Sequence, residues 1–506
     1  MTSHKVIAKN TMFLYIRMFL IMGISLYTSR VILEELGVSD YGIYNLLAGI
    51  LTMIGFFNAA MSSATQRYLS YDIGQEDYPR LKKTFSATLT IHIGIAFLGL
   101  VIAETVGLWY VNKVMVFPEE KWGVVNIVYQ FSILTFLLSI IQVPYNALII
   151  AHERMKVYAY MSILEAILKL GTVFVLMLAT QNKLIIFAIL TFCVSLIIRI
   201  GYQIFCRLQF KESKYSFEYD KTYFLELISY SGWSLFGNIA VLAKVQGVNM
   251  LLNLFFGLVI NASYAITNQL VNAINLVVSN LQMAFNPQII KNYSQGNLEE
   301  TARLVIQGAK ISFFLSLVII MPVLLNTEYI LQLWLKEVPF NTVLFVQLAL
   351  IGVLIESLSG TLIIGVQATG NIKWYQIILG IIIFLNLPIA YLFFKLNYGA
   401  YFAFLISIVI SFFVLSFRFI FLTRILNFRL KGFLRNVILK AALVSILMFF
   451  CYLMHKKYLL EASSFLFFLI ETCLIEIVLI FAIYFIGISK NERLFLRINF
   501  KQILNK

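Results

Sequence analysis

Basic side chains stand inside long apolar runs of this 506-residue chain, at Arg17, Arg30 and Lys244. A charge within a membrane is costly and normally faces a wet interior, where it binds a substrate or carries an ion. A lining rich in arginine and lysine, with few acids nearby, suits a phosphate-bearing substrate. Four asparagines extend the same polar lining: Asn249, Asn268, Asn272 and Asn275. We therefore predict a cationic, polar substrate-binding cleft.

Acids also interrupt apolar runs, and three of them are candidates for ion coupling: Glu34, Glu165 and Glu356. Glu34 lies four residues after Arg30, and Lys169 lies four residues after Glu165. The two residues of each pair therefore share a helix face and are predicted to form an ion pair. Structural interpretations stay open. Arg30 and Glu34 are equally explained as an ion pair at the membrane interface. Arg17 and Lys244 are alternatively explained as side chains that snorkel to the surface. The asparagines are equally explained as contacts between helices.

Catalytic and metal-binding patterns are missing from the sequence. The histidines are scattered and show no metal-ligand spacing: His4, His92, His152 and His455. No phosphate-binding Walker loop, nucleophile elbow or zinc-binding HExxH helix occurs. The sequence therefore predicts a protein that is not an enzyme, with no catalytic residue, no metal and no cofactor.

Membrane-spanning helices are the elements that position these residues. Hydrophobic residues make up 61% of the chain and charged residues 12%, and the mean hydropathy is +0.88. A soluble domain cannot hide so much apolar surface, so we predict an all-α polytopic membrane protein. A spanning helix needs about 20 mostly apolar residues. Breaks at charges, glycines and prolines place about fourteen such helices, at 12–34, 41–65, 84–110, 122–151, 157–179, 184–206, 223–254, 259–286, 304–325, 341–366, 374–394, 399–421, 433–454 and 464–487.

Lysines and arginines are distributed unevenly between the two sides of these helices. Of the 39, 25 fall on the side of the N-terminus and 7 on the opposite side. By the positive-inside rule, both termini are predicted to be cytoplasmic. This distribution also accounts for the net charge of +15, so the expected partner is the lipid bilayer and not nucleic acid.

A repeat links the two halves of the chain at an offset of 220 residues. Gly37 and Gly257 each end an apolar helix, and Tyr44 and Tyr264 stand seven residues after them. Similar polar loops follow in both halves, so two like lobes in parallel orientation are predicted. We place the N-terminal lobe (helices 1–6) at 1–208, a cytoplasmic linker at 209–222, the C-terminal lobe (helices 7–12) at 223–424, and two extra helices with a cytoplasmic tail at 425–506.

The stretch Leu26–Asn45, followed by Arg67-Tyr68-Leu69-Ser70 and Asp72-Ile73-Gly74, resembles the bacterial polysaccharide-transport family. These are the Wzx-like flippases of O-antigen and other repeat units, within the multidrug/oligosaccharidyl-lipid/polysaccharide exporter superfamily. The resemblance covers essentially the whole chain, including the repeat and the two extra helices. It implies a V-shaped pair of six-helix bundles and transport by alternating access.

The resemblance also implies a substrate and a location. The expected protein moves undecaprenyl-pyrophosphate-linked oligosaccharide across the bacterial inner membrane, for O-antigen, lipopolysaccharide or other surface polysaccharide biosynthesis. A polysaccharide polymerase and a chain-length regulator are the implied partners, and the implied state is a monomer. No family catalytic residue exists to carry over. Arg17, Arg30 and Lys244 match the family's cationic lumen by position and charge only.

Other transport functions remain open at this point. A drug/cation antiporter of the same superfamily is expected to place acids deep in one lobe, whereas the deep charges here are mainly basic. A peptidoglycan lipid-precursor flippase also has two helices after the twelfth, and only substrate tests separate it. A membrane glycan polymerase or ligase is disfavoured, because the predicted outer loops are short.

Overall fold

A computed structural model describes residues 3–54, 56–113, 115, 117, 119–180, 182–216, 220–335, 338–425, 430–458, 465–489 and 492–493. All regular structure in this part of the chain is helical. The α-helices are α1 (Ser3–Ile54), α2 (Phe56–Gly74), α3 (Tyr78–Ile102), α4 (Leu108–Lys113), α5 (Trp122–Ala151), α6 (Met155–Leu178), α7 (Lys183–Gln209), α8 (Lys221–Ser294), α9 (Leu298–Leu325), α10 (Thr327–Trp334), α11 (Thr342–Ser357), α12 (Gly360–Ala368), α13 (Lys373–Phe384), α14 (Asn386–Lys395), α15 (Phe402–Ile425), α16 (Leu430–Phe433), α17 (Leu439–Tyr458) and α18 (Phe465–Ala482).

Twelve helical segments of the described residues are long and apolar enough to cross a membrane. The chain is therefore an all-helical, multi-pass membrane protein. Two of the predicted spans, 41–65 and 259–286, are not among the twelve, although their described residues are helical. The first contains Gly55, which lies outside the described residues, so its helix is described in two parts. The second carries eleven asparagine, glutamine, serine or threonine side chains, which lower its hydropathy.

The two repeat-related glycines share one unusual backbone conformation. Gly37 has φ 74° and ψ 165°, and it divides α1 into two arms. Gly257 has φ 79° and ψ −171°, and it divides α8 in the same way. Only glycine adopts this region readily, because it has no Cβ. The helix ends predicted at Gly37 and Gly257 are therefore confirmed.

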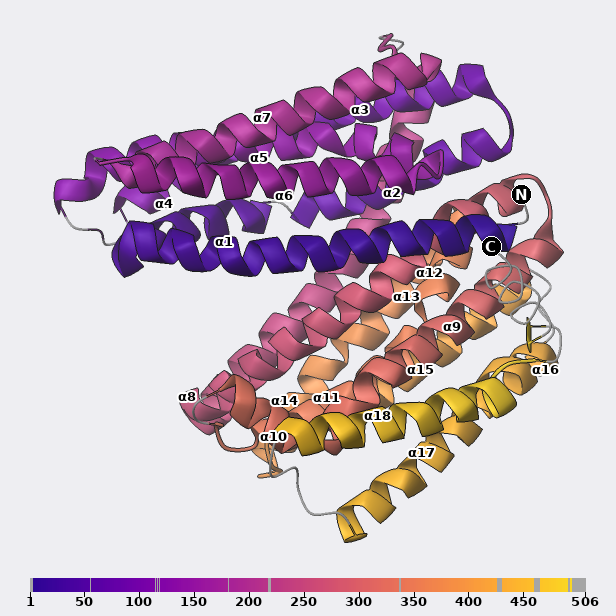
Figure 1. Cartoon of the computed structure of the whole chain (residues 1–506). Coiled ribbons are helices and arrows are strands. Elements are labelled where there is room, and N and C mark those ends of the chain that lie inside the picture. Colours follow the sequence, from indigo (N-terminus) through magenta and orange to yellow (C-terminus); the bar gives the residue numbers. More distant parts are fainter. Residues whose placement is uncertain are drawn as a thin grey trace. The chain divides into compact units, whose positions relative to one another are not determined.

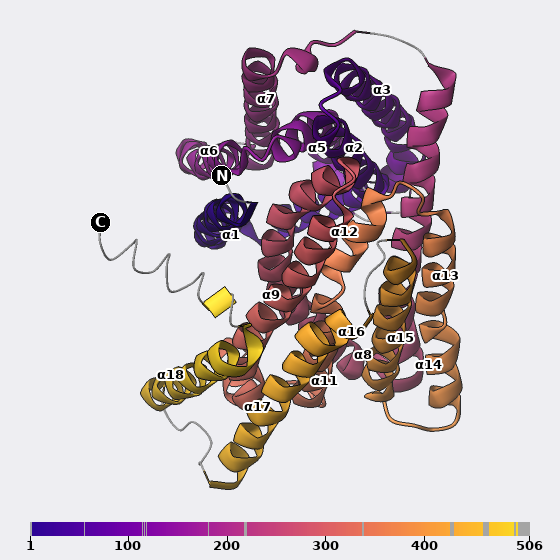
Figure 2. The same ribbon diagram turned by 90° about the vertical axis from the view of Figure 1, so that its right-hand side faces the viewer.

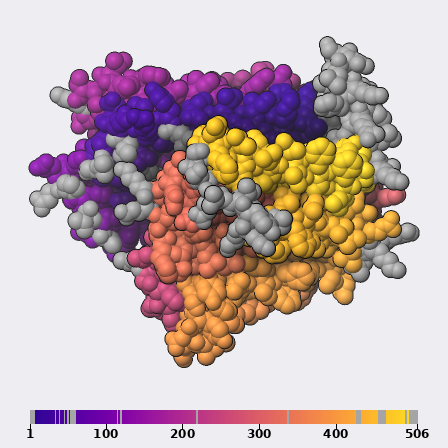
Figure 3. Space-filling model, turned by 60° about the horizontal axis from the view of Figure 1, so that its bottom comes forward, coloured from indigo at the N-terminus to yellow at the C-terminus, as the bar shows by residue number. Residues whose placement is uncertain are grey.

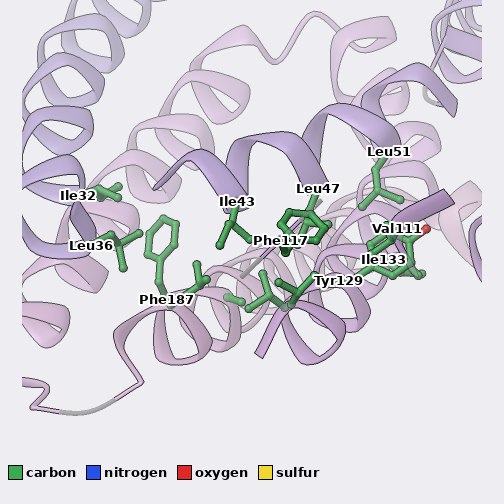
Figure 4. Packing of buried hydrophobic residues seen from close by; sticks show 14 of the residues in the cluster. Ile32, Leu36, Ile43, Leu47, Leu51, Val111, Phe117, Tyr129, Ile133 and Phe187 are labelled. Carbon is green, nitrogen blue, oxygen red and sulfur yellow. The ribbon is translucent and has the colours of Figure 1, made fainter. Parts of the chain in front are cut away.

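Compact unit 1 comprises Met1–Leu235 and Ile290–Gly296. Within it α1 packs against α6, and α5 packs against α7, α3 and α2. Figure 2 shows α1 and α6 side by side and nearly end-on. The core contains residues from both arms of α1, which pack on residues of α5, α7 and the loop before α5. Figure 4 shows Ile32, Leu36, Ile43, Leu47, Leu51, Val111, Phe117, Tyr129, Ile133 and Phe187.

Ion pairs secure the turn between the arms of α1. Glu35, just before Gly37, lies 2.7 Å from Lys183 at the start of α7. Asp40, just after the glycine, pairs with Lys121 before α5. Both lysines follow loops, so the turn is held by the two helices on which the arms pack. Apolar packing alone would not fix the position of the two α1 arms along the helix axis. The ion pairs add this specificity.

A second set of contacts in unit 1 joins segments related by the repeat. A Cβ on Gly74, at the end of α2, would lie 2.0 Å from Ser294 Oγ and 2.8 Å from the Cα of Lys291. Only glycine allows this close approach. Lys291 also lies 2.5 Å from Glu153, and both side chains are mostly buried. The end of α8 is thus held on the bundle that the first half of the chain builds.

Compact unit 2 comprises Phe236–Ile289 and Asn297–Lys506. Here α11 packs against α9 and α15, α12 against α9, and α13 and α14 against α15 (Figure 1). The predicted spans 341–366 and 374–394 are each divided, into α11 with α12 and α13 with α14. The extra helices α17 and α18 pack on α9. Figure 3 shows them in orange and yellow at the surface of this unit.

Replacing Gly257 by alanine is expected to destabilise the protein by about 1–3 kcal/mol, the usual cost of a side chain in this backbone region. No atom lies within 4 Å of the added Cβ, so the loss arises from the backbone alone. Thermal unfolding in detergent measures it. Gly232→Ala in the same helix is the matched control, because its Cβ also meets open space. It is expected to be neutral or to stabilise by up to about 1 kcal/mol, and equal losses for both variants would contradict the assignment.

Candidate functional site

A cavity of about 390 Å³ lies inside unit 1, between α1, α5, α6 and α7. Eleven of its fourteen lining residues have polar or charged side chains, although the helices that form it are apolar on their other faces. The lining residues are Arg17, Ile21, Ile24, Ser25, Thr28, Ser29, Gln142, Asn146, Tyr158, Ser162, Glu165, Ala166, Lys169 and Tyr202.

Helical periodicity explains how the sequence builds this cavity. On α6, Ser162, Glu165 and Lys169 recur at intervals of three and four residues, so they share one face. On α1, the lining residues from Arg17 to Ser29 follow the same rule. Because α1 and α6 pack together along their length, these two polar faces meet. An interface that would otherwise be apolar thus becomes a polar chamber.

Arg17 is the principal cation of the cavity. Its guanidinium carbon lies 4.5 Å from the centre of the Tyr158 ring, a distance at which the ring face attracts a cation. Its Nε atom is buried and has no hydrogen-bond partner within the described chain. Thr28 Oγ1 and Asn146 Oδ1 are also buried without a partner. Buried polar atoms normally bind something, so these three are available to water or to a bound ligand.

A second cation on the wall is already paired. Lys169 Nζ lies 2.7 Å from Glu165 Oε1, which confirms the predicted pairing of these two residues. The Tyr202 hydroxyl forms a hydrogen bond with Ser162 beside them. The ionisable lining therefore consists of Arg17, the pair and two tyrosines, and its net charge is positive. Such a chamber favours an anion that also accepts and donates hydrogen bonds.

Unit 2 contains another of the predicted cations. Lys244 Nζ on α8 lies 3.6 Å from Glu356 Oε1 on α11. Ser411 on α15 donates a hydrogen bond of 2.9 Å to the same oxygen. The structure thus brings together one residue predicted for substrate binding and one predicted for ion coupling. A cleft shared by Arg17 and Lys244 stays a prediction, since they belong to different compact units.

The predicted asparagines have varied surroundings in unit 2. Asn261 donates a 2.6 Å hydrogen bond to Asn249, which is the contact between helical segments considered as the alternative. Asn268 forms a hydrogen bond with Tyr264. Asn272 is exposed and Asn275 is half-buried. Their role in substrate binding remains a prediction.

Arg30 and Glu34 form the predicted pair at 3.0 Å, with side chains 78% and 58% exposed. Neither residue lines the cavity of unit 1, although Ser29 beside them does. The surface position fits the structural interpretation of this pair. No contact in the described chain tests the role in substrate binding predicted for Arg30 or the role in ion coupling predicted for Glu34.

Sequence reasoning did not select several residues that line the cavity. Tyr158 and Tyr202 are hard to select, because aromatic residues on apolar helices usually serve packing. Gln142 and Asn146 carried a usable signal: two amides four residues apart within a long apolar span share one face. Among the described residues no group of three histidine, cysteine, aspartate or glutamate side chains is placed to hold a metal ion.

Comparison with known proteins gives two family matches. The profile described as "Polysaccharide biosynthesis protein" matches residues 7–293, which is more than half of the chain. The profile described as "MatE" matches residues 235–392. No curated protein sequence matches the chain significantly.

Solved structures with the same fold are distant in sequence. A MATE protein in a straight conformation matches with a TM-score of 0.73 and 11% identity, over 84% of this chain and 96% of that one. An outward-facing multidrug resistance MATE transporter of the MOP superfamily matches with 0.70 and 13%, over 84% and 96%. A MOP superfamily transporter from Pyrococcus furiosus, described as having a binding pocket of reverse polarity, gives the same values. These likenesses establish the MATE-like fold.

Inorganic pyrophosphate is expected to raise the melting temperature of the detergent-purified protein, because Arg17 provides the cavity with a half-buried cation whose Nε donor has no partner. Saturation at a hundredfold excess over Kd corresponds to about 2.7 kcal/mol of added stability. Arg17→Ala is expected to remove most of the shift. Lys9→Ala, at an exposed cation of the same helix that does not line the cavity, is the matched control and is expected to keep it. Equal shifts in both variants would show that the cavity is not the anion site.

Proposed function

The chain belongs to the polysaccharide biosynthesis protein family and has a MATE-like fold, and on that premise we propose that it is a transporter of the MOP superfamily rather than an enzyme, namely a lipid-linked oligosaccharide flippase. The proposed substrate is an undecaprenyl-pyrophosphate-linked repeat unit. The protein would move it from the inner to the outer leaflet of the bacterial inner membrane by alternating access. The product would then serve O-antigen or other surface polysaccharide biosynthesis.

The observation that carries this proposal is the cavity around Arg17. It offers a cation with an unpartnered donor, and hydroxyl and amide groups surround that cation. A diphosphate needs the first of these and a sugar needs the second. A cavity of about 390 Å³ is at the small end of ligand sites, so it suits the diphosphate and the adjoining sugar rather than a whole oligosaccharide.

Physical chemistry explains why such a chamber is required for the proposed substrate. Burial of a diphosphate and sugar hydroxyls in hydrocarbon without hydrogen bonds is prohibitively costly. The polyprenyl chain, in contrast, is as apolar as the lipid. A transporter that shelters only the head, and leaves the tail in the bilayer, therefore removes the main part of the barrier.

The remaining parts of the proposal concern topology and partners. We propose fourteen crossings, with the twelve apolar helices joined by the two polar segments at 41–65 and 259–286. Both termini are then cytoplasmic, and lobes at 1–208 and 223–424 flank a linker at 209–222, with two extra helices at 425–506. The protein acts as a monomer, beside a polymerase and a chain-length regulator. The positive-inside bias of 25 basic residues against 7 supports this orientation.

A drug/cation antiporter is less well supported. Glu165 is the acid among the described residues that line the cavity, and it is paired with Lys169 at 2.7 Å. A cationic drug would meet Arg17 without a free carboxylate to compensate. A peptidoglycan-precursor flippase has the same head-group chemistry, and it differs only in the glycan that it carries.

Arg17→Ala is expected to abolish complementation of a deletion strain, so that lipid-linked oligosaccharide accumulates in the inner leaflet. The wild-type chain is expected to restore surface glycan. Arg17→Lys is expected to retain part of the function, because it keeps the charge and loses the planar fork. The measurement is the amount of lipid intermediate accessible from each side.

Lys9→Ala, at an exposed cation of α1 outside the cavity lining, is the control for this experiment, and it is expected to complement as wild type does. Expression and melting temperature are matched for all variants. If the wild-type chain changes only drug sensitivity, a drug/cation antiporter function replaces the proposed flippase function. If Arg17→Ala complements fully, the flippase function survives, but the assignment of the cavity does not.

Membrane potential is expected to assist transport, because a negative head moves outward from a negative interior. The gain is about 2.3 kcal/mol per charge for each 100 mV. Proteoliposomes with an imposed potassium diffusion potential measure this effect as a change in initial flipping rate. A rate that ignores both the sign and the size of the potential would contradict a charge-translocating step.

A further inference from the structure

We propose that the two extra helices, at the end where α17 begins and α18 ends, bind the phosphate of an anionic glycerophospholipid. The residues that bind it are three cations, Arg435, Lys440 and Arg493. This site belongs to unit 2, whereas the cavity around Arg17 belongs to unit 1, so the two can be tested independently. The ligand is a lipid of the surrounding bilayer, and it helps to hold the extra helices on α9.

A buried ion pair ties the end of α18 to α9. Lys310 in α9 is 6% exposed, and a buried ammonium in an apolar helix needs a counter-ion. Glu492, beyond the end of α18, supplies it, with Lys310 Nζ 2.6 Å from Glu492 Oε2. The same oxygen accepts hydrogen bonds of 2.7 Å from the amide and the hydroxyl of Ser489. Glu492 is thus committed to Lys310 and to its own turn.

Further cations gather around this pair. Lys440 in α17 lies close enough to Lys310 and Glu492 to interact with both charges. Arg435 and Arg493 act on Lys440 as like charges. No ion pair joins any of these three cations to an acid within the described part of the chain. With Glu492 committed to Lys310, the three remaining positive charges repel one another, and an anion placed among them relieves that repulsion.

Arg493 has a hydrogen-bond donor available for such an anion. Its Nη2 atom donates a hydrogen bond of 3.3 Å to the carbonyl oxygen of Phe485, which keeps the guanidinium at the end of α18. Its carbon atom Cζ lies 6.0 Å from the centre of the Tyr484 ring. Its Nε atom is buried and has no hydrogen-bond partner among the described residues. Buried donors normally have a partner, and a phosphate oxygen is a strong acceptor for a guanidinium.

The position of the cations along the helices favours a lipid over a soluble phosphate. Arg435 lies on the helical turn Leu434–Ile438, where the apolar span of α17 begins. Arg493 follows the turn Ile483–Gly487, where the apolar span of α18 ends. Because α17 packs against that second turn, the two span ends meet. The cations therefore stand at the border of the apolar layer, which is the depth of a phospholipid head group.

Exposed apolar side chains adjoin the cations. Leu434 and Leu439 are the sequence neighbours of Arg435 and Lys440, and both are about half exposed. Phe485 is 59% exposed. Such residues on a membrane-spanning helix face acyl chains. A glycerophospholipid satisfies both features, with its phosphate on the cations and its chains along the apolar faces. A zwitterionic lipid fits less well, because its ammonium group adds another positive charge.

A phosphate at this place would join segments that are distant in the sequence. Arg435 and Lys440 come from the start of α17, and Arg493 comes from the segment beyond α18. One phosphate diester has enough acceptor oxygens to bind cations from both segments. Since α17 and α18 both pack on α9, the bound lipid adds to the contacts that hold them there. We therefore expect anionic lipid to stabilise the protein.

Native mass spectrometry of the purified full-length protein tests the site, because it resolves bound lipids by mass. The probe is 1-palmitoyl-2-oleoyl-phosphatidylglycerol, and 1-palmitoyl-2-oleoyl-phosphatidylcholine has the same chains without net charge. The wild type is expected to bind the first at least about tenfold more tightly than the second, and to melt at a higher temperature with it. Glycerol 3-phosphate at the same concentration, which lacks chains, is expected to leave the melting temperature unchanged.

Glutamine variants test the cations themselves. Arg435→Gln and Lys440→Gln are each expected to weaken binding of phosphatidylglycerol about fivefold, the usual contribution of one basic residue near an anionic lipid. Arg435 is exposed and Lys440 is half-buried, so both variants are expected to fold, which the melting temperature without lipid checks. Lys373→Gln removes an exposed cation of the same unit and is the matched control. It is expected to bind as wild type does, and so is Arg17→Ala.

Four results would overturn the inference. Equal affinity of the wild type for the two lipids would show that the charge of the head group does not matter. A full effect of glycerol 3-phosphate would identify a soluble phosphate as the ligand. An equal loss in Lys373→Gln would indicate general attraction to surface charge, and a loss in Arg17→Ala alone would move the site to the cavity. None of these results bears on the proposed flippase function, since transport is not measured.

Discussion

The free energy of placing a charge inside a hydrocarbon layer governs the interior of this protein. An ion there needs a partner, an aromatic face or a polar chamber, since no bulk water relieves it. Unit 1 uses all three, with the Arg17 guanidinium on the Tyr158 ring, the Lys169–Glu165 pair and the hydroxyl-lined cavity around them. Unit 2 places Lys244 with Glu356 across two helices. The packing of the apolar helices leaves room for these arrangements.

Backbone geometry provides the second constraint, and it concerns only a few positions. Gly37 and Gly257 adopt a region that other residues rarely enter, and Gly74 permits a backbone approach that a side chain would block. Two of the three positions are related by the repeat. The turn at Gly37 also carries ion pairs on both sides, so its direction is determined by side chains as well as by the glycine.

Much of this architecture is predictable from the sequence, because hydropathy, glycine position and i,i+4 spacing are local properties. The turn at Gly37, the Arg30–Glu34 pair and the Glu165–Lys169 pair follow from such patterns. The cavity does not, since it depends on which faces of α1, α5, α6 and α7 meet. Tyr158 and Tyr202 look like packing residues until Arg17 is placed beside them. The breaks between α11 and α12 and between α13 and α14 do have local signals, Gly360 and Pro388, but these signals do not show that one apolar run divides into two helices.

The unpartnered polar atoms of the cavity wall have a consequence for what the chamber rejects. Arg17 Nε, Thr28 Oγ1 and Asn146 Oδ1 are buried without a hydrogen-bond partner among the described residues, so a molecule in the chamber is favoured if it offers them polar groups. An apolar molecule of the right volume would displace that solvation and strand all three atoms, at about 1–3 kcal/mol each. A polyhydroxylated head replaces it hydrogen bond for hydrogen bond. If the proposed function holds, dehydration of the wall, more than steric fit, would separate sugar head groups from apolar drugs on a fold shared with a multidrug resistance MATE transporter.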